Sequence, residues 1–163
     1  MAFVINTPIA GAQAIDTTDT TKRHALGTIV RATDPTYGAG EFVFLLGVAS
    51  TAVGSWVTYN MDDGSTALLA ANAIGPVAVA MSANVASQYG WYQIDGKAVG
   101  KALAAYADNG LVFATATAGS IDDAVVIGDR VKNAKGASAV DTPSTGLAEF
   151  EIHRPLMDDG TAA

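Results

Sequence analysis

The fold class is indicated most clearly near the middle of the chain, where residues 88–94 read QYGWYQI. Aromatic side chains favour strands, and a period of two places Tyr89 and Trp91 on one face of the strand and Tyr92 on the other. The pair Asp95-Gly96 follows directly, and such a pair tolerates the positive φ angles of a tight hairpin. We therefore predict a strand that ends at residue 94 and a hairpin turn at Asp95-Gly96.

Similar short apolar or alternating segments recur along the chain, with glycine-containing turns such as Asp63-Gly64 and Asn109-Gly110 between them. The predicted strands are residues 26–32, 41–48, 55–60, 76–82, 88–94, 111–115, 124–131 and 147–154. Residues 66–74 are alanine-rich and could form one short helical turn, whereas we favour a strand for residues 99–107. Many short strands with turns between them predict an all-β fold, an antiparallel β-sandwich or a jelly-roll-like barrel.

The first 25 residues differ from the rest, and we interpret them as an extended N-terminal arm on a body of residues 26–155, with residues 156–163 as a C-terminal tail. The 163 residues suit one domain. Because the arm begins with apolar side chains, we expect Phe3, Val4, Ile5 and Ile9 to pack on a neighbouring subunit and to fasten an oligomer or a larger assembly. The alternative is a disordered tail.

The charge, the cysteine content and the distribution of apolar residues exclude several classes of function. The formal net charge is −7 and the nine Lys and Arg residues form no basic stripe, which argues against nucleic-acid binding. Cysteine is absent, which excludes disulfides and thiolate metal sites. No apolar run has the length of a membrane span, and the first 15 residues lack the basic start of a secretion signal. Only 15% of residues are charged, so we expect part of the surface to be buried against identical copies or a partner.

The sequence contains no nucleophile elbow, phosphate loop or zinc-protease motif. We therefore predict no catalytic residue, no metal site and no cofactor, and we expect His24 and His153 to be ordinary surface residues. The acidic pairs are interpreted as solvated turns, with a metal site or a carboxylate pair as the alternatives. These pairs are Asp62-Asp63, Asp122-Asp123 and Asp158-Asp159.

The aromatic residues offer the best alternative to a purely structural function. Trp91 and Tyr89, together with Trp56 and Tyr92, could form a platform on which sugar rings or bases stack. We favour a core or a subunit contact for them, because the two faces of the strand cannot both be exposed. Trp91 and Tyr89 remain candidates for a surface contact with a carbohydrate or receptor.

Several segments resemble a group of tailed-phage structural proteins, the capsid decoration or cement proteins. The similar segments are residues 26–38, 40–50, 78–81, 88–94 and 128–131. The resemblance covers about residues 26–155. It implies a β-sandwich or jelly-roll-like body that forms small symmetric oligomers and bridges subunits of the major capsid protein on the outside of the virion, after assembly in the host cytoplasm. Because closed symmetry is usual for homo-oligomers, we predict a homotrimer, or alternatively a homodimer. The resemblance implies no nucleic-acid or membrane partner. The alternative is a β-sandwich module on the virion surface that binds a carbohydrate or receptor.

Overall fold

The computed structural model describes residues 2–158, which form β-strands, turns and loops without a helix. The strands are β1 (Val4–Ile5), β2 (Thr18–Asp19), β3 (Ile29–Asp34), β4 (Gly38–Leu46), β5 (Trp56–Tyr59), β6 (Thr66–Leu68), β7 (Ile74–Ala80), β8 (Tyr89–Lys101), β9 (Leu111–Ala114), β10 (Ile121–Asp122), β11 (Arg130–Gly136) and β12 (Leu147–Asp158). The prediction of an all-β fold is confirmed.

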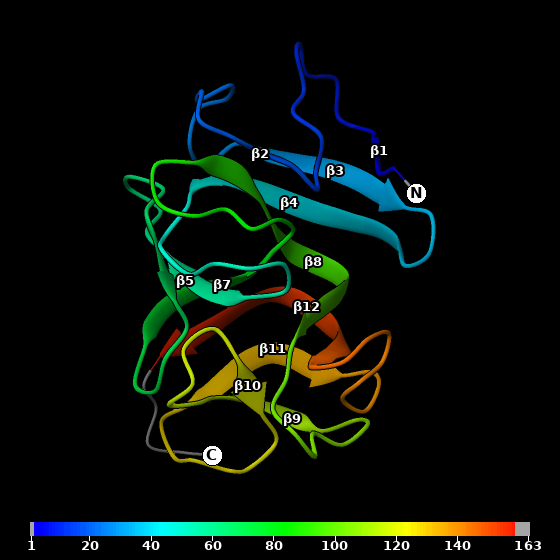
Figure 1. The fold of residues 1–163 in the computed structure, drawn as a ribbon, viewed down its shortest axis with the longest axis vertical. Helices are drawn as coiled ribbons and strands as arrows, with labels where there is room; N and C mark the ends of the chain where they lie inside the picture. Colours follow the sequence, from blue (N-terminus) through cyan, green and yellow to red (C-terminus); the bar gives the residue numbers. More distant parts are fainter. Residues whose placement is uncertain (1, 159–163) are drawn as a thin grey trace.

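All twelve strands belong to one sheet, and every strand pair in it is antiparallel. Its main path runs β1-β3-β4-β8-β7-β12-β11-β9-β10, with β2 paired to β8 and β5 joining β6 to β7. Because β8 also pairs with β12, the strands β7, β8 and β12 are each bonded to the other two, and the sheet curls on itself. In Figure 1, β3 and β4 lie at one end of the molecule, β9 to β11 lie at the other, and β8 runs between them.

The long strand β8 corrects the predicted hairpin at Asp95-Gly96. Residues 89–95 of β8 pair with β4, and residues 95–101 pair with β12, so the chain continues straight through Gly96. Gly96 does have a positive φ of 99°, as the turn prediction required. A Cβ atom at this position would lie 2.6 Å from the Ala39 carbonyl oxygen. Gly96 therefore allows an irregular backbone conformation at the point where β8 changes its partner strand from β4 to β12. No turn forms there.

Alternation along the strands sorts the core into separate clusters. In β4, Phe42 and Phe44 face the cluster that contains Trp91, while Val43 and Leu45 face the cluster that contains Tyr92. The continuously apolar segment predicted as a strand is therefore covered on both faces, as such runs usually are. The largest cluster lies around β12, where Phe150 and Ile152 are fully buried.

The N-terminal segment lies along the body of its own chain. Strand β1 pairs with β3, β2 pairs with β8, and Ile15 is 1% exposed in the same cluster as Trp91. The predicted tail boundary at residue 156 also shifts, since β12 extends to Asp158 and Met157 is buried in the largest cluster. The strands within residues 2–158 thus belong to one continuous sheet. The segment predicted to be an extended arm packs on the body of its own chain instead.

Two further segments differ from the sequence prediction. Residues 66–74 contain the short strand β6 and a turn, with no helical turn. The strand predicted over residues 124–131 begins only at Arg130, and residues 123–129 form a loop. For residues 99–107 the strand prediction holds as far as Lys101.

Candidate interaction surface

The aromatic residues that could have formed a binding platform lie mostly inside the molecule. Trp91, Tyr92 and Trp56 are 0% exposed, and the Trp91 indole N–H donates to the Gln13 carbonyl oxygen at 2.9 Å. Tyr89 is half-buried and stacks on Phe44, with ring centroids 6.3 Å apart. The candidate surface contact at Trp91 is therefore wrong, because the N-terminal segment covers that side of β8.

Three of the four arm residues contact the chain's own core. Phe3, Ile5 and Ile9 pack against the Trp91 cluster, and the Phe3 ring meets Phe42 edge-on at 5.7 Å. Val4 points outward and is 60% exposed. Of these four side chains, Val4 alone is free to meet a neighbouring subunit without a rearrangement.

The segment is fastened further along by Gln13 and His24. The Gln13 amide side chain donates to the carbonyl oxygens of Thr17 and Tyr89, and the Gln13 backbone N–H donates to His24 Nε2 at 3.1 Å. His24 is 8% exposed and packs edge-on against Phe44, which corrects the expectation of a surface residue. Burial, with a smaller contribution from the Arg23 charge, lowers the pKa of His24. A neutral imidazole with a free Nε2 lone pair therefore suits this position.

His153, Asp62, Asp63 and Asp158 lie at the surface, as expected, whereas Asp122 and Asp123 are half-buried. His153 Nδ1 lies 3.3 Å from an Asp95 carboxylate oxygen, and its side chain is 75% exposed. Bonding from the Ser65 hydroxyl, and next from the Ser65 backbone N–H within the turn, lowers the pKa of Asp63. Asp159 lies outside the described residues. In the part of the chain that the structure describes, no group of three or more His, Asp or Glu side chains is placed to hold a metal ion.

The loop between β10 and β11 exposes three consecutive aliphatic side chains, which the sequence analysis had assigned to a strand. Val125 is 62% exposed, Val126 is 46% exposed and Ile127 is 66% exposed. We call these three residues the apolar tip. Soluble proteins seldom expose such a run unless it meets something else, because burying it in a partner would lower the free energy.

Hydrogen bonds at both ends hold the loop that carries the apolar tip. On one side, the Asp123 carboxylate accepts a bond from the Ala107 backbone N–H at 2.9 Å. On the other side, the buried Asp129 carboxylate accepts a bond from the Asn72 backbone N–H at 2.6 Å, and the Asp129 carbonyl oxygen accepts one from Ala114 N–H at 2.8 Å. The apolar tip is thus presented by an anchored loop.

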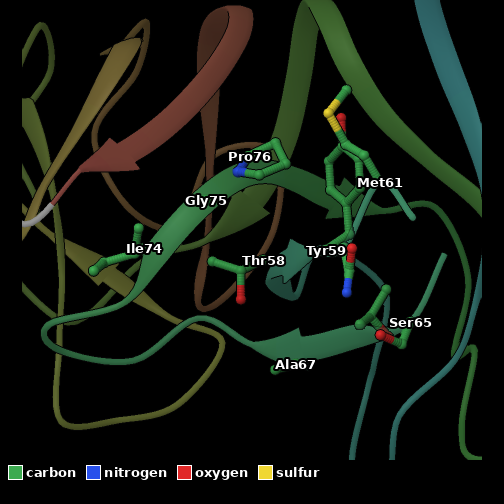
Figure 2. Close-up of a pocket in the computed structure, with 10 residues that line it drawn as sticks. Thr58, Tyr59, Met61, Ser65, Ala67, Ile74, Gly75 and Pro76 are labelled. Atoms are coloured by element: carbon green, nitrogen blue, oxygen red, sulfur yellow. The ribbon is translucent and has the colours of Figure 1, made fainter. Parts of the chain in front are cut away.

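A pocket of about 430 Å³ opens beside the strands β5, β6 and β7 (Figure 2). We call it the β5–β7 pocket. It is lined by Thr58, Tyr59, Asn60, Met61, Ser65, Thr66, Ala67, Ile74, Gly75 and Pro76. In Figure 2, Thr58 lies between Ile74 and Tyr59, and Ser65 lies beside Tyr59. Met61 is 75% exposed and Ile74 is 68% exposed, so the rim of the pocket is apolar. Its lining contains no ionisable group apart from Tyr59, whose pKa burial raises.

One hydrogen bond connects the segment that carries the apolar tip to the segment that leads into the β5–β7 pocket. The Asn72–Asp129 hydrogen bond ties the turn that precedes Ile74 to the end of the loop that carries Ile127. Each exposed side chain stands two residues from the bonded pair. A second hollow, which Arg154 lines, shares Tyr59, Asn60 and Met61 with the pocket. The two hollows therefore meet at the exposed side chain of Met61.

Comparison of the chain with protein-family models, with curated proteins and with solved structures finds no match. Within residues 2–158 there is also no helix long and apolar enough to cross a membrane.

Proposed function

We propose that this chain is a structural protein of a virus particle, a decoration or cement protein that forms a closed homo-oligomer on the capsid exterior and bridges subunits of the major capsid protein. The observation that carries the proposal is the apolar tip, three consecutive exposed aliphatic residues on an anchored loop. Such a feature is suited to contact with another macromolecule. The resemblance of segments within residues 26–155 to tailed-phage decoration proteins, noted in the sequence, is the reason for proposing a capsid as that assembly.

The electrostatics and the shape of the chain support the same function. A net charge of −7 favours a position on the outside of a shell, away from packaged nucleic acid. The body is a single sheet in which β8 is bonded along its length to β4 and β12, so it can act as a stiff spacer. A stiff protein that binds two capsid subunits at once adds its binding free energy to the stability of the shell.

The proposal includes no catalytic step, no metal and no cofactor. The β5–β7 pocket is lined by hydroxyl, amide and apolar side chains, without a carboxylate or a histidine to act as an acid or base. Burial of Trp91 and Trp56 also removes the aromatic platform on which the carbohydrate-binding alternative depended.

Co-expression with the major capsid protein of a candidate tailed phage tests the proposed function. Shells purified on a density gradient are expected to carry this chain in a fixed ratio to the capsid protein, and to withstand higher temperature than undecorated shells. A chain that stays at the top of the gradient, at protein concentrations above micromolar, contradicts the proposal. Light scattering of the free chain then distinguishes the trimer from the dimer.

A further inference from the structure

We infer that a hollow beside β8 binds the ammonium group of an aliphatic primary amine. We call it the β8 hollow. It measures about 230 Å³, and its polar lining consists of Asp16, Asp34, Tyr37, Gln93 and Lys97. It shares no lining residue with the β5–β7 pocket. The inference goes beyond the proposed function and does not rest on it, because the groups that carry it lie within one copy of the chain.

Segments that lie far apart in the sequence bring apolar side chains to the β8 hollow. Phe3 comes from the N-terminal segment, Val53 from the loop before β5, Met81 from the residue after β7 and Val99 from β8 itself. The volume is below the roughly 300–1,000 Å³ of pockets that hold drug-sized molecules. The hollow therefore suits a ligand with a short apolar stem.

Gln93 presents an unused hydrogen-bond acceptor to the hollow. Its side chain is buried, with the residue 4% exposed, and Nε2 donates to the carbonyl oxygens of Asp95 at 3.0 Å and Lys97 at 3.2 Å. Because both of these partners are acceptors, they fix the orientation of the amide and leave Oε1 as its free acceptor. Oε1 accepts no hydrogen bond within residues 2–158 and is not sealed from solvent. Buried polar groups are nearly always hydrogen-bonded, so this oxygen favours a ligand that donates.

The positive charge that lines the hollow is already paired. The Lys97 ammonium lies 2.6 Å from a Glu149 carboxylate oxygen, and the Tyr37 hydroxyl donates to the same carboxylate. Lys97 also lies over the Tyr37 ring, 5.4 Å from its centroid. Since Lys97 is neutralised within the chain, it does not make the hollow a site for an anion.

The two carboxylates that line the hollow remain able to accept. Asp16 has no hydrogen bond or ion pair within residues 2–158. Asp34 uses only Oδ1, which accepts bonds from two backbone N–H groups of the following turn at 2.6 Å and 3.1 Å. Asp16, Asp34 and Glu149 together carry three negative charges, against the one positive charge of Lys97. This excess of negative charge attracts a cation.

An organic cation fits the hollow better than a metal ion does. Ca²⁺ takes six to eight oxygen ligands, whereas the free side-chain acceptors here are two carboxylates and one amide oxygen. A protonated primary amine has three N–H donors, one for each of Asp16, Asp34 and Gln93. Its aliphatic stem can pack on the apolar part of the lining, where water is displaced.

A backbone-amide NMR titration with n-butylammonium chloride tests the inference, with n-butanol as a neutral ligand of the same length and ionic strength held constant. The resonances of Gln93, Lys97 and Val99 are expected to shift and to saturate. The affinity should exceed that for n-butanol by about fivefold or more, because charge-assisted hydrogen bonds are stronger than neutral ones. Equal affinity for the two ligands, or shifts spread evenly over the chain, overturns the inference.

Three single substitutions separate a local site from attraction by the net charge. Asp16→Asn and Asp34→Asn each remove one negative charge from the hollow, and Asp62→Asn removes one from an exposed turn that does not line it. An asparagine oxygen can still accept the bonds that Asp34 receives, and Asp16 has none to lose, so both variants should keep the urea midpoint of the unaltered protein. We expect each to weaken butylammonium binding about threefold or more, and Asp62→Asn to leave it unchanged. Equal weakening by all three contradicts the inference.

A further ligand distinguishes a free amine from a lysine side chain as the source of the ammonium group. Nα-acetyl-lysine N-methylamide carries the same four-carbon stem on a peptide backbone. Binding as tight as that of butylammonium supports the inference with a lysine of another protein as the occupant, and binding about tenfold weaker supports it with a free amine. If neither ligand binds, the inference is wrong and the proposed function, which the density gradient tests separately, is unaffected.

Discussion

The two ends of the molecule differ in whether their apolar segments are buried within the chain. At the end formed by β3 and β4, the N-terminal segment folds back so that Phe3, Ile5 and Ile9 pack on the Trp91 cluster. At the other end, the loop before β11 is held with Val125, Val126 and Ile127 in solvent. The apolar residues that looked most suited to bind a partner are thus used within the chain. The three residues that the sequence placed in a strand, Val125, Val126 and Ile127, are exposed to solvent instead.

Substitutions at the two ends should differ most in their effect on the free energy of unfolding. Trp91→Ala removes a 0% exposed side chain and its hydrogen bond to Gln13, and we expect it to lower the free energy of unfolding by about 3–5 kcal/mol. Val126→Ala at the apolar tip should change it by less than about 0.5 kcal/mol, since the side chain contacts mostly solvent. Urea unfolding followed by tryptophan fluorescence for Val126→Ala, and by circular dichroism for both, measures the difference. Similar losses in the two variants would show that the tip is part of the folded core.

Deletion of residues 2–12 should have a smaller effect on stability and tests what the N-terminal segment does. The deletion removes three partly buried apolar side chains, Phe3, Ile5 and Ile9, and keeps Gln13 with its bonds. We expect a loss of about 2–4 kcal/mol in the free energy of unfolding, with the mass by light scattering unchanged. The matched control is Val4→Asp, at a 60% exposed position, which should affect neither quantity. A truncated protein that keeps its stability but dissociates would restore the arm as the oligomer contact.

The sequence was sufficient for the fold class and for strands with clean alternation. In β3, Val30 and Ala32 are buried while Ile29 and Arg31 are exposed, as the period of two predicts. It was not sufficient at Asp95-Gly96, since a glycine with positive φ fits both a hairpin and an irregular point in a long strand. Only the pairing of β8 with two different strands separates these possibilities.

The candidate surface was missed for a related reason. Val125-Val126-Ile127 is β-branched and apolar, which is the composition of a buried strand, and the sequence carries no sign that flanking hydrogen bonds hold it in a loop. The N-terminal segment shows the same limit. Its composition indicates that Phe3 and Ile5 need burial, but whether the covering surface belongs to the same chain depends on contacts far apart in sequence, such as those of β1 with β3.

The smallest effect expected is a pH dependence confined to the N-terminal end. His24 accepts the Gln13 backbone N–H at Nε2, and burial lowers its pKa below the ordinary value of 6.5. The unfolded chain therefore binds a proton more readily than the folded one. The stability that neutral His24 contributes is fully present above about pH 6.5 and is lost as the pH falls from there towards the lowered pKa.

Urea midpoints measured between pH 8 and pH 5 should accordingly fall more steeply for the unaltered protein than for His24→Gln, which cannot titrate and whose amide oxygen can accept the same bond. His153 and the carboxylates are common to both proteins, so the difference between the two curves belongs to His24. Curves with equal slopes would mean that the buried imidazole is accommodated equally well with a proton. In that case the N-terminal segment would depend on packing alone, as the contacts of Phe3, Ile5 and Ile9 with the Trp91 cluster already allow.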